Sequence, residues 1–191
     1  MPTINTNKPN RLLQENTQAM IIDVQEKFVP HIHQMDKTCQ KIAILAQGLQ
    51  LLGIPVMLNE QYPQGLGKTV STINDVLTEV NQRVFEKQTF SVCDCDVSWN
   101  HVAKQNRNNV ILCGIEAHVC VQQTALDLLD NGMQPILIAD AVSSRNEFDK
   151  QVAIERMRHA GAVITTVEGI LFEMCKTSKH EAFKSISKLV T

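Results

Sequence analysis

Short apolar runs alternate with amphipathic patterns along this chain, and this alternation constrains the fold more than any other feature. Runs typical of buried strands occur at 19–22, 55–58, 83–85, 110–113, 135–139 and 162–166, the run at 83–85 being the weakest. Continuous apolar runs of this length are typical of strands covered on both faces, as in parallel sheets.

Helical patterns lie between these runs. One helix is expected over residues 39–52, ending at Gly53, and a second over 119–129, ending at Asn131-Gly132. A third is preceded by Ser144 and Glu147 at capping-box spacing and carries a predicted buried face of Phe148, Val152, Met157 and Ala160. A terminal helix is expected around 183–189.

Strand–helix alternation predicts right-handed crossovers and a parallel sheet with helices on both sides. The expected fold is therefore a single α/β domain of three layers (α/β/α), with a Rossmann-like sheet of about six strands. The 191 residues suit one domain. We expect a flexible arm at residues 1–15 and the folded domain at 16–191, because the first residues are polar and contain Pro2 and Pro9.

Composition limits the possible partners and compartments. The formal net charge of −2 gives no reason to expect nucleic acid or an anionic membrane as a partner, whereas a small-molecule substrate is compatible with it. No apolar run approaches the ~20 residues that span a bilayer. The six cysteines are scattered and residues 1–17 do not resemble a secretory leader, so we expect reduced thiols and a cytoplasmic protein.

In sheets of this kind, ligands bind beyond the carboxyl ends of the strands, and three reactive residues fall there. Asp23 follows the run 19–22, and Lys87 follows 83–85. Cys120 lies just after the run 110–113 and Gly114, where a helix begins. Taken singly, these residues are also compatible with a turn aspartate, a solvated lysine and a buried apolar thiol.

Together they favour a nucleophilic cysteine. The positive end of the helix dipole and the ammonium of Lys87 are both expected to lower the pKa of the Cys120 thiol. The thiolate is the nucleophilic form of cysteine, and free N–H groups at a helix start can hold an oxyanion.

The order and spacing of these segments resemble the isochorismatase-like cysteine hydrolase superfamily, over residues 16–175. The matching segments are 22–25, 86–91, 114–121 and 140–145, and the segment 60–67 is similar to the isochorismatase-domain-containing branch. The resemblance implies that Cys120 attacks a carbonyl or nitrile-like carbon, that Asp23 moves the proton, and that Lys87 holds both charges. It also implies a cis peptide between Ile115 and Glu116, whose N–H helps to hold the oxyanion.

Two departures from relatives narrow the expected chemistry. Nicotinamidases are similar but carry an Asp and His pair after the second strand that holds a divalent metal. Here that region reads Asn59-Glu60-Gln61-Tyr62, so we expect no metal and no cofactor. Isochorismatases proper cleave a vinyl ether and lack the matching cysteine, so Cys120 favours hydrolysis of an amide, ureide or imide.

Side chains that follow strand ends are candidates for the substrate pocket: Phe28, Gln61, Tyr62, Leu66, Phe90 and His118. Arg145 is expected to pair with a carboxylate or the backbone, although a substrate contact is also compatible with its position. The segment 65–69 ends like a phosphate-binding loop, but Tyr62 stands where that motif requires a glycine, so we do not expect nucleotide binding. Cys93 and Cys95 lack the spacing of a metal or redox pair.

The leading hypothesis is thus a metal-independent hydrolase of a small C–N bonded substrate that forms an acyl-enzyme on Cys120. Two alternatives stay open: vinyl ether hydrolysis of a chorismate-like diacid, and a non-catalytic, partner-binding member of the fold. The resemblance also implies a homo-oligomer, a dimer or larger.

Overall fold

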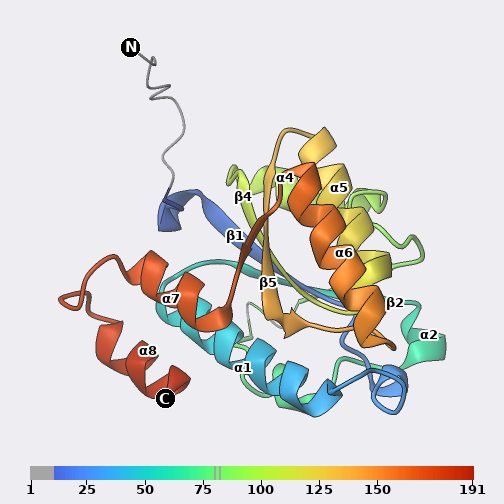
Figure 1. Cartoon of the computed structure of the whole chain (residues 1–191), viewed down its shortest axis with the longest axis horizontal. Coiled ribbons are helices and arrows are strands. Elements are labelled where there is room, and N and C mark those ends of the chain that lie inside the picture. Colours follow the sequence, from blue (N-terminus) through green and yellow to red (C-terminus); the bar gives the residue numbers. More distant parts are fainter. Residues whose placement is uncertain (1–10, 80, 82) are drawn as a thin grey trace.

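The computed structural model describes residues 11–79, 81 and 83–191, and its centre is one parallel sheet (Figure 1). All strand pairs are parallel, and the strand order is β3-β2-β1-β4-β5-β6. The strands are β1 (Thr17–Ile22), β2 (Val56–Gln61), β3 (Val84–Lys87), β4 (Asn109–Gly114), β5 (Gln134–Val142) and β6 (Val163–Thr165). The predicted α/β class and parallel six-stranded sheet are therefore confirmed.

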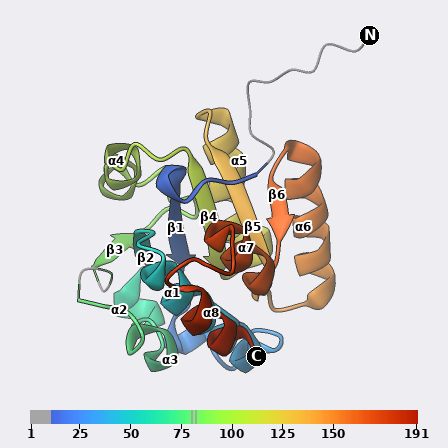
Figure 2. The same ribbon diagram turned by 90° about the vertical axis from the view of Figure 1, so that its left-hand side faces the viewer.

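Helices cover both faces of the sheet and make the outer two layers (Figures 1 and 2). One face carries α1 (Met35–Leu51), α7 (Val167–Cys175) and α8 (Phe183–Val190), with the short α3 (Ser71–Asn74) beside α1. The other face carries α4 (Asp96–Lys104), α5 (Gln122–Asp130) and α6 (Glu147–Ala160). Short elements are η1 (Gln14–Asn16), η2 (Glu26–Phe28), α2 (Pro63–Leu66) and η3 (Ala117–Val121).

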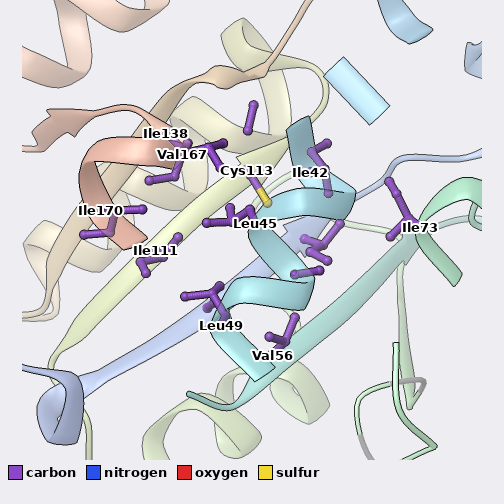
Figure 3. Packing of buried hydrophobic residues seen from close by; sticks show 14 of the residues in the cluster. Ile42, Leu45, Leu49, Val56, Ile73, Ile111, Cys113, Ile138, Val167 and Ile170 are labelled. Atoms are coloured by element: carbon purple, nitrogen blue, oxygen red, sulfur yellow. The ribbon is translucent and has the colours of Figure 1, made fainter. Parts of the chain in front are cut away.

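Successive residues of β1 belong to two different cores. Ala19 and Ile21 pack with α1, α7 and α8, whereas Met20 and Ile22 pack with α4, α5 and α6. Figure 3 shows the first of these cores, where side chains of α1 and α7 meet the sheet. Burial on both faces explains why the strands are continuous apolar runs instead of alternating ones.

The sequence patterns missed α4 and α7 for opposite reasons. Within α4 only Ser98 and Val102 are buried, so its apolar pattern is too sparse to stand out. Most of α7 is apolar, and five of its residues are buried, so no helical period is visible in its sequence.

The predicted details of α6 were wrong in two respects. Ala153 and Met157 are the buried residues of α6, while Phe148 and Val152 are exposed. Ser144 forms no capping box; its hydroxyl is hydrogen-bonded to His118 Nδ1 at 2.9 Å.

Residues 1–10 of the predicted arm lie outside the described residues. In the described remainder, the Leu12 N–H donates to Glu173 Oε1 at 2.9 Å, and Gln14 donates to the Leu52 carbonyl. All six cysteines lie in the described part and are free. Among the described helices, none is long and apolar enough to cross a membrane.

Candidate active site

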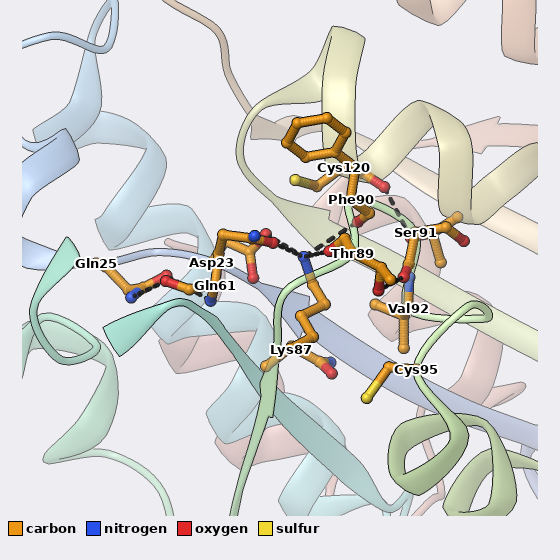
Figure 4. Close-up of polar contacts among 12 residues, drawn as sticks. Asp23, Gln25, Gln61, Lys87, Thr89, Phe90, Ser91, Val92, Cys95 and Cys120 are labelled. Carbon is orange, nitrogen blue, oxygen red and sulfur yellow. Dashed lines mark hydrogen bonds and ion pairs between the residues drawn. The ribbon is translucent and has the colours of Figure 1, made fainter. Parts of the chain in front are cut away.

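The three reactive residues of the sequence come together near the topological switch point between β1 and β4, where the strand order of the sheet reverses. Asp23 directly follows β1, Lys87 is the last residue of β3, and Cys120 lies in η3, a π-helical turn that leads into α5 (Figure 4). Crevices at such switch points are the usual ligand sites of open α/β sheets.

A close backbone approach brings the Cys120 turn to Asp23. Gly114 ends β4 with φ +119°, and a Cβ atom there would lie 2.1 Å from the Ile22 carbonyl oxygen. The next residue, Ile115, donates its N–H to the same Ile22 carbonyl at 2.9 Å. Glycine at 114 therefore lets the segment leading to Cys120 run against the end of β1.

Lys87 and Asp23 form a buried ion pair. Lys87 Nζ donates to Asp23 Oδ2 at 2.7 Å, and both side chains are almost fully buried. The ammonium also meets Gln61 Oε1 at 2.8 Å and the carbonyls of Thr89 and Phe90 at 3.2 and 3.0 Å. Four acceptors around three N–H groups fix the position of the ammonium within the protein.

Gln61 is held in place by Gln25. The Gln25 side chain accepts from the Gln61 N–H at 2.8 Å and donates to the Gln61 carbonyl at 3.0 Å. The Gln61 amide then reaches Lys87 on one side and donates to the Gln88 carbonyl at 2.7 Å on the other. Sequence reasoning placed Gln61 only in the pocket wall and gave Gln25 no role.

Thr124, also missed from the sequence, ties the loop after β3 to the Cys120 turn. Its hydroxyl donates to the Cys120 carbonyl at 2.7 Å and accepts from the Val92 N–H at 3.0 Å. A threonine inside a helix gives no sequence signal for this bridge, because donating to the carbonyl four residues earlier is common for threonine in helices.

The charges around Cys120 do not produce a stable thiolate. Burial raises the pKa of Cys120, and the neighbouring Asp23 carboxylate adds to the shift, while Lys87 opposes it. The expected lowering of this pKa was therefore wrong, since desolvation outweighs the ammonium. The resting thiol keeps its proton at neutral pH and needs a base to remove it.

Asp23 is suited to be that base. Burial raises the pKa of Asp23, although the charge and hydrogen bond of Lys87 oppose the shift, and the Cys120 thiol interacts with the carboxylate as well. Oδ2 accepts from Lys87, whereas Oδ1 is buried without a hydrogen bond of ordinary geometry among the described residues. That free oxygen can accept a proton.

The peptide bond between Ile115 and Glu116 is cis, as the resemblance implied. Ile115 is fully buried, and Glu116 accepts hydrogen bonds at Oε2 from the N–H and Nε of Arg145 at 3.2 and 3.0 Å. Arg145 therefore pairs with a carboxylate.

A pocket of about 420 Å³ opens onto Cys120. Five of the six expected wall residues line it: Phe28, Gln61, Tyr62, Leu66 and Phe90. Gln88, Glu116 and Val119 complete the lining, and sequence reasoning had not placed them in the wall. His118 lies outside this lining, and its ring contacts Ser144.

Asn59 and Glu60, where the resemblance implied that a metal-binding pair is missing, form hydrogen bonds within the protein. Asn59 is fully buried, and its Oδ1 accepts from the Ser98 hydroxyl at 3.4 Å. Glu60 Oε1 accepts from the N–H and hydroxyl of Thr69 at 2.6 and 2.7 Å. No group of three His, Cys, Asp or Glu side chains suited to a metal occurs among the described residues.

Comparison with known proteins assigns this chain to a family. The sequence model of the isochorismatase domain matches residues 17–169. Isochorismatase family protein 1A of Dictyostelium discoideum is 40% identical over 181 residues, which cover 93% of this chain and 87% of that protein.

Solved structures agree with this placement. The structure of MAR1 ribonuclease from Caenorhabditis elegans is 38% identical, covers 94% of this chain and 92% of its own, and has a TM-score of 0.89. An octameric hydrolase of unknown specificity from Escherichia coli, YcaC, shares the fold at 20% identity and a TM-score of 0.88, over 96% and 91% of the two chains. This chain therefore belongs to the isochorismatase-domain family, and its relatives support its assignment as a hydrolase.

Proposed function

We propose that this protein hydrolyses a C–N bond of a small molecule, an amide, ureide or imide, through a covalent acyl-enzyme on Cys120. The observation that carries the proposal is the Asp23 carboxylate, which has one oxygen on Lys87 and one oxygen free beside a protonated thiol. A buried thiol with a raised pKa becomes a nucleophile only with such a base at hand.

In the first half of the reaction, Asp23 takes the thiol proton while Cys120 Sγ attacks the substrate carbonyl. The N–H groups of Cys120 and Glu116 are proposed to hold the oxyanion of the tetrahedral intermediate. The C–N bond then breaks, and the proton moves from Asp23 to the leaving nitrogen. Lys87 stays charged throughout and keeps the Asp23 carboxylate in position.

In the second half, a water molecule enters after the amine has left. Asp23 removes a proton from the water, which attacks the thioester carbon, and the C–S bond breaks. The proton returns to the sulfur and the carboxylic product leaves. The two steps use only water and these side chains.

The test is a screen of small amides, ureides and imides with wild-type protein and the Cys120→Ser and Asp23→Asn variants. We expect turnover by the wild type, a loss of at least about a thousandfold in Cys120→Ser, and a thioester adduct on Cys120 by mass spectrometry. Turnover that survives Cys120→Ser would contradict the proposal.

The pocket lining argues against vinyl ether hydrolysis of a chorismate-like diacid. Two substrate carboxylates need cationic partners, and the described residues that line the pocket include no Lys or Arg. A non-catalytic role predicts instead that Cys120→Ser leaves the cellular function intact.

The name of the Caenorhabditis elegans relative suggests RNA as an alternative substrate. A chain of net charge −2 with Glu116 among its pocket-lining residues is poorly suited to the anionic sugar–phosphate backbone of RNA. We therefore expect no Cys120-dependent cleavage of single-stranded RNA.

We further propose that the protein is a cytoplasmic homo-oligomer. The Escherichia coli structural relative is described as octameric, and α6 exposes Phe148 and Val152, which a second copy could cover. Light scattering coupled to size-exclusion chromatography would measure the mass of the particle in solution, and a monomer would contradict the proposal.

A further inference from the structure

We infer that Glu116 sets the charge preference of this pocket, which disfavours anionic substrates and favours a neutral or cationic molecule that presents an N–H group to the carboxylate. The inference rests on the proposed function, because it concerns the molecule that reaches Cys120. It assigns Glu116 a role in substrate selection through its side chain.

Glu116 and Arg145 form an ion pair of very unequal burial. Glu116 lines the pocket with Cys120 and its side chain is 8% exposed, whereas the Arg145 side chain is 60% exposed. Both hydrogen bonds from Arg145 reach Oε2, and neither reaches Oε1. Arg145 is not among the residues that line the pocket.

The unequal burial leaves a negative field in the pocket. Water and salt screen the exposed guanidinium more strongly than the buried carboxylate. Lys87 does not compensate, since its positive charge is balanced by the Asp23 carboxylate with which it pairs at 2.7 Å.

The remaining lining fits a small, uncharged nitrogenous molecule. Phe28, Leu66, Phe90 and Val119 offer apolar surface, and Gln88 and Tyr62 offer uncharged polar groups. An N–H group of an amide or ureide against Glu116 gains a charge-assisted hydrogen bond. A substrate carboxylate there would instead face a like charge in a partly buried site.

Alkylation of Cys120 tests this preference without knowledge of the substrate. Iodoacetate, iodoacetamide and 2-bromoethylammonium are anionic, neutral and cationic, and in each case a C–S bond forms as a halide leaves. Peptide-resolved mass spectrometry follows Cys120 separately from the partly exposed Cys95. Each rate constant is divided by the rate constant for the same reagent with 2-mercaptoethanol. This division cancels the differences in intrinsic reactivity among the three reagents.

We expect the normalised rates to rise from iodoacetate to iodoacetamide to 2-bromoethylammonium. Glu116→Gln should raise the iodoacetate-to-iodoacetamide ratio by about threefold to tenfold, the effect of one partly screened charge. Arg145→Gln should lower that ratio, and because its side chain is exposed this variant is expected to fold. Glu86→Gln, the same change outside the Cys120 pocket, should leave the ratio unaltered.

The outcomes separate this inference from the proposed function. Equal normalised rates in the wild type, or a ratio that responds equally to Glu116→Gln and Glu86→Gln, would overturn the charge preference and leave the nucleophile in place. Failure of all three reagents to label Cys120 would overturn both.

Discussion

At the residue scale, the site depends on placing a charged lysine where water is excluded. Lys87 Nζ is surrounded by the Asp23 carboxylate, the Gln61 amide and two backbone carbonyls. Burying an ion pair costs desolvation free energy that only such complete hydrogen bonding offsets. The pair is therefore better explained by its function at the site than by a gain in stability.

Replacing one partner of this pair should be costly. Lys87→Met leaves the Asp23 carboxylate buried without a counter-charge, and we expect a loss of about 3–5 kcal/mol in the free energy of unfolding. Without Lys87 the pKa of Asp23 rises further, so the loss should be larger at pH 7.5 than at pH 5, where more of the carboxyl is protonated. Urea unfolding at the two pH values measures both effects.

Two further variants serve as controls for this prediction. The double variant Asp23→Asn with Lys87→Met should lose less than Lys87→Met alone, because no unpaired charge remains. Lys41→Met breaks the half-exposed pair with Asp140, at 3.5 Å, and should cost less than about 1 kcal/mol. Similar losses in the free energy of unfolding for Lys41→Met and Lys87→Met would show that burial of the unpaired Asp23 carboxylate is not the cause of the loss.

At the scale of elements, the close contact of β1 and β4 and the turn that follows it position the nucleophile. β4 ends at Gly114, the peptide after Ile115 is cis, and the chain enters η3 before α5 begins at Gln122. Single π-helical turns are frequent at functional sites. The Thr124 hydroxyl then fixes this turn to the loop that cradles Lys87.

Gly114→Ala should disrupt this junction. The new Cβ would meet the Ile22 carbonyl oxygen at 2.1 Å, and the residue would have to keep φ +119°. Backbone atoms cannot move aside as a side chain does, so we expect a loss of more than about 3 kcal/mol by urea unfolding, or no folded protein.

Gly132→Ala is the matched control. Gly132 also has a positive φ, +75°, but no atom lies within 4 Å of the position that a Cβ would take there. The substitution should cost only about 1 kcal/mol. Equal losses at the two glycines would show that backbone conformation, and not the close approach to β1, limits position 114.

At the scale of the whole molecule, two apolar cores on either side of the sheet bury most of the cysteines. Burial raises the pKa of Cys39 to about 11 and of Cys93 to about 12, and it raises the pKa of Cys113 as well. Because of these thiols, the free energy of unfolding should depend on pH in the alkaline range.

The free energy of unfolding should fall as the pH rises above about 8.5, where thiols of the unfolded chain ionise. Folded thiols with raised pKa values keep their protons, so the unfolded state releases protons first and is favoured. One fully buried thiol contributes up to about 1.4 kcal/mol per pH unit in this range. Cys113→Ala should flatten the dependence measured by urea unfolding between pH 8 and 10; an unchanged slope would contradict the linkage.

Much of the fold could be predicted because strands that are buried on both faces of the sheet appear in the sequence as continuous apolar runs. All six strands were located from apolar runs, β3 from the weakest of them, and α1, α5, α6 and α8 were located from their helical patterns. The orientation of α6 could not be predicted, because Phe148 and Val152 are as apolar as the buried Ala153 and Met157. Only packing against the sheet distinguishes the two faces.

Local sequence determined the strands, the helices α1, α5, α6 and α8, and the placement of Asp23, Lys87 and Cys120 at strand ends, because these follow from periodicity and chain direction. The tertiary structure alone decided the protonation of Cys120 and the acceptors around Lys87. It also decided that Glu116 lines the pocket with a buried side chain while the Arg145 side chain is exposed. These properties depend on desolvation and on contacts between residues far apart in the chain, such as Lys87 with Asp23 and Arg145 with Glu116, and neither leaves a local pattern in the sequence.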